Sequence, residues 1–101
     1  MKVYLVMRYY DNGESYEDHY DSFEHLAVCE SKEMAWNYIL KEVEKDLKEE
    51  PVDAGFSNKD KWKIVEKNEE NNTCSLSRVQ YWATEEVVYS ICEEEVLKKE
   101  D

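Results

Sequence analysis

The chain has 101 residues, of which 25 are acidic and 13 basic, so its formal net charge is −12. Direct binding to nucleic acid or to an anionic membrane is not expected, because both need a basic face and neither half of this chain is basic. The length predicts a single domain over residues 1–101.

The cysteines and the hydropathy pattern bear on the compartment. Three widely spaced cysteines, Cys29, Cys74 and Cys92, form no CxxC motif, which indicates small buried hydrophobes in a reducing compartment rather than disulfides. No apolar run approaches the roughly 20 residues of a membrane span. We therefore expect the protein in the cytoplasm.

The first half of the chain predicts two strands and a helix. Lys2–Tyr10 alternates apolar side chains as a strand does, and the Asp-Asn-Gly that follows has turn chemistry. Phe23–Glu30 is expected to be a second strand, antiparallel to the first, with Leu26 and Val28 on one face. Ser31 then predicts the start of an amphipathic helix of about four to five turns, which ends before Pro51.

The second half predicts further strands. Lys61–Lys67 and Thr73–Ala83 indicate a hairpin, and Phe56 in the preceding loop is expected to pack across a sheet edge. Residues 85–96 fit either a strand or a helix, although their β-branched and aromatic content favours a strand. The expected fold class is α+β, with the order ββαβββ and one helix covering a mainly antiparallel sheet.

Both histidines of the chain lie in the stretch Tyr9–His25, among six carboxylates and four tyrosines and without any lysine or arginine. A metal site is disfavoured, because no HExxH, Cys/His or calcium-loop pattern is present. A His25–Cys29 catalytic pair is disfavoured too, since four residues of a strand span roughly 13 Å. Two isolated glycines exclude phosphate-cradling loops, so a nucleotide enzyme is not expected. Since no other catalytic or metal motif is present, no enzyme activity, cofactor or metal is expected, and an enzyme that uses a cysteine or a histidine is the third hypothesis.

The remaining interpretation of this stretch is recognition. Carboxylates attract basic surfaces, and tyrosine supplies rigid contact area with a polar tip. The competing interpretation is a solvated loop whose charges keep a sheet edge from pairing with other chains. The candidate partner-binding residues are Asp11, Glu14, Tyr16, Glu17, Asp18, Tyr20, Asp21 and Glu24.

The opening MKVYLVMRYYD, the helix entry at Ser31-Lys32-Glu33-Met34-Ala35 and the later KWKIVEK resemble small uncharacterised proteins of Gram-positive bacteria and their phages. In type, being small, acidic and free of catalytic motifs, the chain is similar to phage anti-defence proteins such as anti-CRISPR inhibitors. That likeness implies docking on a basic nucleic-acid-binding protein.

The leading hypothesis is thus a non-enzymatic acidic inhibitor that mimics nucleic acid and blocks a basic partner, such as a CRISPR nuclease. The alternative is a small housekeeping module or accessory subunit that forms a homo-oligomer, with acidity serving solubility alone. Charge and patterning leave the identity of the partner and the oligomeric state open.

Overall fold

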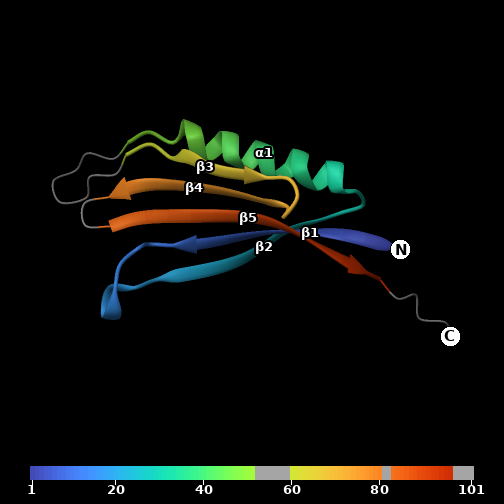
Figure 1. The fold of residues 1–101 in the computed structure, drawn as a ribbon, viewed down its shortest axis with the longest axis horizontal. Coiled ribbons are helices and arrows are strands. Elements are labelled where there is room, and N and C mark those ends of the chain that lie inside the picture. The colour runs from blue at the N-terminus through green and yellow to red at the C-terminus, as the bar shows by residue number, and fades with distance from the viewer. Residues whose placement is uncertain (52–59, 81–82, 97–101) are drawn as a thin grey trace.

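A computed structural model describes residues 1–51, 60–80 and 83–96 of the chain. These residues form one antiparallel sheet of five strands in the order β2-β1-β5-β4-β3, with one long helix (Figure 1). The predicted α+β class is confirmed, and the structure adds a short 3-10 helix between the first two strands. The elements are β1 (Lys2–Asp11), η1 (Tyr16–Asp18), β2 (Asp21–Cys29), α1 (Lys32–Lys48), β3 (Lys63–Asn68), β4 (Thr73–Gln80) and β5 (Ala83–Glu95).

The C-terminal run is a strand, which settles the choice between strand and helix over residues 85–96. β5 pairs with β1 on one side and with β4 on the other, so it lies at the centre of the sheet. Val87, Tyr89 and Ile91 are buried at alternate positions. Because β-branched and aromatic residues pack well on a pleated surface, this central place accounts for their density here.

The second strand was predicted, but the prediction that Leu26 and Val28 share one face of it was wrong. β2 is antiparallel to β1 as expected, but a bulge shifts the register, so that Val6 pairs with Ala27 and Met7 with His25. Leu26, the extra residue, packs against the core, whereas Val28 is exposed. A bulge adds one residue to one strand and thereby breaks the strict alternation on which the prediction rested.

The helix begins and ends close to its predicted limits. The Ser31 hydroxyl accepts a hydrogen bond from the backbone N–H of Met34 at 3.1 Å, so it caps the first turn. Ala35, Ile39 and Val43 are buried at four-residue spacing and face the sheet.

The predicted hairpin of β3 and β4 is present, although its strands are shorter than expected. β4 ends at Gln80, and Ala83 already belongs to β5. Asn72 in the connecting turn adopts a φ of 57°, which asparagine tolerates well. The expected packing of Phe56 lies outside the described residues.

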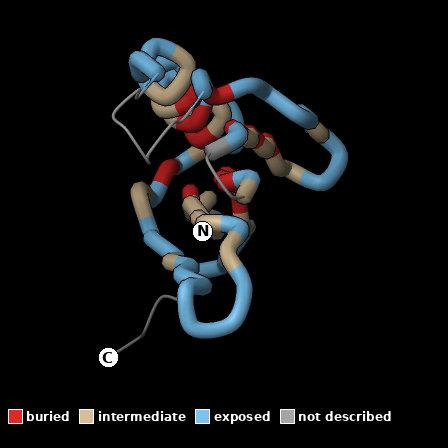
Figure 2. Tube along the Cα trace, turned by 90° about the vertical axis from the view of Figure 1, so that its left-hand side faces the viewer, coloured by how far each residue is buried: buried red, intermediate tan, exposed pale blue. Residues whose placement is uncertain are grey.

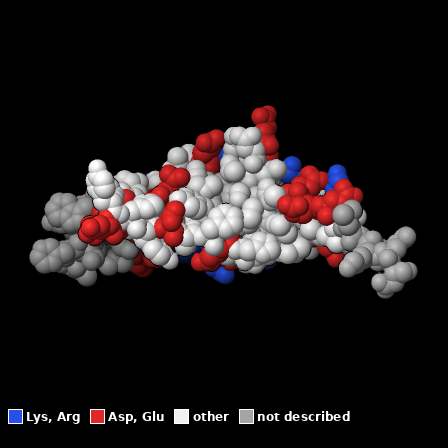
Figure 3. Space-filling model, turned by 90° about the horizontal axis from the view of Figure 1, so that it is seen from below, with Lys and Arg blue, Asp and Glu red and all other residues white. Residues whose placement is uncertain are grey.

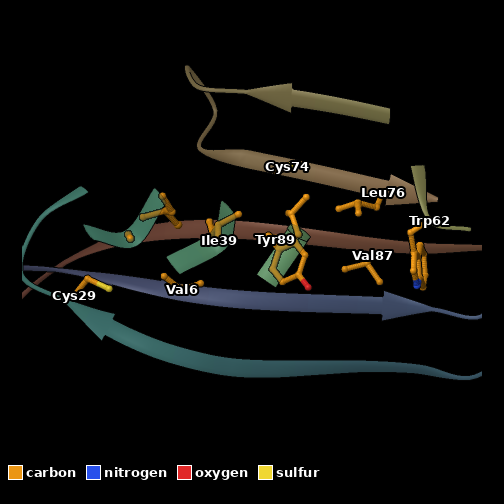
Figure 4. Close-up of a cluster of buried hydrophobic side chains, with 11 residues drawn as sticks. Val6, Cys29, Ile39, Trp62, Cys74, Leu76, Val87 and Tyr89 are labelled. Carbon is orange, nitrogen blue, oxygen red and sulfur yellow. The ribbon is translucent and has the colours of Figure 1, made fainter. Parts of the chain in front are cut away.

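The hydrophobic core lies between α1 and one face of the sheet (Figures 2 and 4). Ile39 of the helix belongs to the same buried cluster as Val6, Leu76, Val87 and Tyr89 of the three central strands. Cys29 and Cys74 are buried in this cluster as expected, while Cys92 is half-buried and belongs to the other face.

We call that other face of the sheet the open face, because among the described residues no helix covers it. Strand alternation and the pairing registers place apolar side chains across β2, β1 and β5 of this face. They are Val3, Leu5, Met7, Tyr9, Phe23, Val28 and Val88.

Candidate functional site

The segment Asp11–Glu24, called the acidic segment below, forms the end of the β1–β2 hairpin. Asp11 closes β1, Asp21 opens β2, and η1 lies in the loop between them. This loop is almost entirely exposed at the bottom of Figure 2. The acidic segment therefore projects from one end of the sheet, with its backbone anchored on two paired strands.

Asn12 holds this loop in place through hydrogen bonds of its backbone and its side chain. Its backbone N–H donates to the carbonyl of Tyr20 at 3.0 Å. Its side-chain Oδ1 accepts from the backbone N–H groups of Glu14 at 3.0 Å and Tyr20 at 3.1 Å. Its Nδ2 donates to the carbonyl of Asp18 at 2.9 Å. Satisfying these backbone groups internally gives the loop a defined conformation without regular pairing.

Gly13 explains how the chain leaves β1 so sharply. Its φ is +74°, a region that side chains disfavour, and a Cβ there would lie 2.1 Å from the carbonyl oxygen of Thr84. The backbone N–H of Gly13 donates to Asp11 Oδ1 at 2.7 Å, and this bond is the main reason that the pKa of the Asp11 carboxyl is lowered. Asp11 is therefore a carboxylate in neutral solution.

Two of the predicted contact residues, Asp11 and Asp21, are brought together on the open face. They are cross-strand partners, and the Tyr9 hydroxyl donates to Asp21 Oδ2 at 2.9 Å and lies 3.4 Å from Asp11 Oδ2. The bond to Asp21 is the largest cause that raises the pKa of Tyr9 to about 12. His19 Nε2 lies 3.3 Å from Asp11 Oδ2, so this histidine is tethered to the same carboxylate.

Three further predicted residues, Tyr16, Glu17 and Asp18, form η1 at the tip of the loop. All three are exposed, and the Tyr16 side chain is 95% exposed with a φ of 55°. Tyr20 follows them and remains largely exposed, although its ring lies 6.2 Å from that of Tyr10. The tip thus presents two tyrosines and two carboxylates to solvent.

Glu14 and Glu24 do not join this group in the way that the sequence predicted. Glu14 is half-buried at the base of the loop. Glu24 pairs with Arg8, and the register places it on the helix side of the sheet, opposite to Asp21. The bulge in β2 lies further along the strand, so ordinary alternation between positions 21 and 24 is what separates these two carboxylates.

The charge distribution agrees with this placement. Seen from the β2 side, the molecule shows carboxylates scattered over an otherwise uncharged surface, with few basic groups (Figure 3). The acidic segment contains no lysine or arginine that would neutralise it. An approaching basic group therefore meets carboxylates that no basic residue of the acidic segment offsets.

The structure gives no support to the metal and nucleophile interpretations of the two histidines. Within residues 1–51, 60–80 and 83–96, no group of three His, Cys, Asp or Glu side chains is arranged to hold a metal ion. His25 is exposed on the open face, whereas Cys29 is buried on the helix side. Position on opposite faces keeps this thiol and this imidazole apart.

A buried polar cluster at the C-terminal end of α1 was not predicted. Arg78 forms an ion pair with Glu85, whose side chain is 1% exposed, and Arg78 Nη1 lies 3.1 Å from Glu49 Oε1. The Arg78 guanidinium is 4.3 Å from the centroid of the Trp62 ring, and Trp62 Nε1 donates to Glu49 Oε2 at 3.1 Å. Tyr10 donates to Glu85 Oε1 at 2.8 Å, which links the cluster to β1.

Burial acts against the charged form of Arg78, but its hydrogen bonds to Glu85 and Glu49 outweigh burial and raise its pKa. The sequence did contain a signal for this cluster. Arg78 continues the inward alternation of Cys74 and Leu76, and Glu85 precedes the inward alternation of Val87 and Tyr89. Charges of opposite sign at inward positions of two adjacent strands predict a buried pair.

No family model, curated protein or solved structure matches this chain. Within the described residues, α1 is too short and too polar to cross a membrane.

Proposed function

We propose that this protein is a non-enzymatic acidic binding protein that docks on a basic, nucleic-acid-binding partner and blocks it. The observation that carries the proposal is the tip of the acidic segment. Tyr16, Glu17 and Asp18 are held outward on a loop that Asn12 fastens internally. A preorganised loop loses little conformational freedom on binding, so more of its contact energy remains as affinity.

The chemistry of the tip suits arginine-rich surfaces. Carboxylates pair with guanidinium groups, bidentately in the best geometry, and tyrosine rings add stacking area for the same groups. A groove that binds nucleic acid displays such groups to phosphates and bases. Occupation of that groove by the acidic segment would exclude the nucleic acid, which is inhibition by mimicry.

Small size, acidity and the resemblance to small phage proteins favour a role in phage anti-defence. We propose that the chain is an anti-CRISPR-like or other anti-defence protein of a phage or mobile element, acting in the cytoplasm of the bacterial host. A CRISPR effector nuclease is the first partner to test, because it holds nucleic acid in a strongly basic channel.

The test is a competition assay in which the protein displaces nucleic acid from a CRISPR nuclease at several salt concentrations. The variant Glu17→Lys/Asp18→Lys reverses the tip. The matched control, Glu69→Lys/Glu70→Lys, makes the same change of net charge in the exposed β3–β4 turn. We expect that displacing the nucleic acid takes at least about ten times more of the tip variant than of the control. Equal loss in both variants would show that total charge alone drives binding.

The second candidate function is a homo-oligomer or accessory subunit whose acidity serves solubility. The exposed apolar side chains of the open face, Phe23 and Val28 among them, favour it. Size-exclusion chromatography with light scattering decides between the two. A stable dimer with no affinity for basic proteins would support this second candidate and reject the first.

A further inference from the structure

The open face carries an apolar stripe that follows β1 along the middle of the sheet. Val3, Leu5, Met7 and Tyr9 occupy alternate positions of β1. From Val3 to Tyr9 the strand rises about 20 Å, at roughly 3.3 Å per residue. Phe23 and Val28 of β2 widen the stripe, and their side chains are 63% and 59% exposed.

Carboxylates lie at both ends of this stripe and on one side of it. Asp11, Asp21 and Glu86 lie in one cross-strand row at one end, and Glu94 pairs with Val3 at the other end. Glu66 of β3 lies on the same face, as the partner of Ser75. Among the paired strand positions that the structure describes, Lys63 is the single lysine or arginine on the open face. The apolar stripe therefore has an acidic rim.

The rim acts against a second copy of the same chain as the natural occupant, although the exposed apolar groups alone would favour one. Two open faces packed together would bring five carboxylates of each copy against the same five, with a single lysine on each side. Like charges brought together at an interface act against association. Charge complementarity requires an occupant that is apolar along its centre and basic around it.

The shape of the stripe points to a helix as the occupant. A partner strand would pair at an edge of the sheet, because its backbone hydrogen bonds need an unpaired strand, whereas a face offers side chains alone. A stripe of about 20 Å matches roughly 13 residues of helix, given a rise of 1.5 Å per residue. The opposite face of this sheet already binds a helix, α1, through Ala35, Ile39 and Val43.

We infer that the open face is the docking surface for an amphipathic helix of the partner, with one apolar side and lysines or arginines flanking it. This inference rests on the proposed function, since it names the partner element that a basic protein would present. Asp11 and Asp21 belong both to the acidic segment and to the rim, so one partner could contact the loop tip and the open face together.

The test uses two synthetic peptides of leucine and lysine with identical composition. In the first, the leucines follow helical spacing and line one side; in the second, they are spread around the helix. Binding to the full chain is measured by isothermal titration calorimetry. We expect the patterned peptide to bind about tenfold or more tightly than the scrambled one, because burial of even one large apolar side chain is enough for such a ratio.

Two variants locate the site. Phe23→Ser/Val28→Thr should weaken binding of the patterned peptide about tenfold, while both side chains are exposed enough that folding is preserved. The control Met34→Ser/Leu40→Ser removes two exposed apolar groups from α1 instead and should bind as the parent does. Circular dichroism confirms that each variant is folded.

Equal affinity for both peptides, no binding of either, or an unaffected Phe23→Ser/Val28→Thr variant would overturn the inference. A stable dimer that this variant abolishes would overturn it as well, in favour of a second copy. If the peptides fail to discriminate while the chain still displaces nucleic acid from the nuclease, the open-face inference is wrong and the proposed function stands. If displacement fails, the proposed function is wrong.

Discussion

Arg78 and Glu85 are direct cross-strand partners in β4 and β5, and their side chains form an ion pair that is buried on the helix side of the sheet. Glu85 also accepts a hydrogen bond from Tyr10, and Arg78 also contacts Glu49. This cluster connects three strands to the end of α1. It therefore fixes the end of the sheet that carries the acidic segment.

Replacement of Arg78 by Met should lower the free energy of unfolding by about 3–5 kcal/mol, because the buried Glu85 carboxylate loses its ion pair with Arg78. The control, Lys48→Met, removes the exposed pair with Glu44 and should change stability by less than about 1 kcal/mol. Urea denaturation measures both. The double variant Arg78→Leu/Glu85→Leu should be more stable than Arg78→Met, and a double variant that is less stable would contradict this account.

The acidic loop makes a separate prediction at Gly13. Gly13→Ala should lower the free energy of unfolding by about 1–3 kcal/mol, because the new Cβ meets the backbone of Thr84 and the positive φ is strained. Ser15→Ala is the matched control in the same loop, since the Ser15 side chain forms no capping bond, and it should stay within about 0.5 kcal/mol. Equal stability of the two variants would mean that the loop is not held against Thr84.

Much of the fold could be predicted because its elements have clear periods. The alternation in Lys2–Tyr10 and the three- and four-residue spacing after Ser31 report local structure directly. The pairing of β1 with β5 could not be predicted, since it joins residues about 80 positions apart and leaves no mark on either strand alone. The bulge at Leu26 was missed for a related reason, because one extra residue is visible only once the partner strand is known.

In the candidate site, too, local features could be predicted and features that depend on strand pairing could not. The turn chemistry of Asp11, Asn12 and Gly13 was predictable, because each residue type has a known local preference. The separation of Asp21 from Glu24 follows from strand alternation, which the grouping of all the acidic residues as one surface ignored. The buried Arg78–Glu85 pair was not predicted, because it can be recognised only once β4 and β5 are known to pair, and neither strand shows this alone.

Alkaline pH should destabilise the protein through its tyrosines. Burial, with the bond to Glu85 second, raises the pKa of Tyr10 from 10.0 to about 12, and the bond to Asp21 raises that of Tyr9 to about 12. A group whose pKa is raised by folding contributes stability that is fully present below pH 10 and is lost as the pH rises toward about 12. The free energy of unfolding should therefore decrease as the pH rises from 10 to about 12.

Absorbance of the phenolate measures this effect directly, in native buffer and in concentrated urea. We expect part of the native titration to lie at higher pH than the titration of the unfolded chain, and Tyr10→Phe to reduce the difference. Coincident curves would show that these hydroxyls do not hold their protons more tightly in the folded state.

The central claim is that the tip of the acidic segment contacts a basic partner. The most direct measurement is hydrogen–deuterium exchange of the full chain, alone and in complex with the nuclease that it displaces from nucleic acid. The account predicts added protection of backbone amides in residues 12–20, with no added protection of the β3–β4 turn. Protection confined to the turn or to the exposed side of α1, with residues 12–20 unchanged, would contradict it.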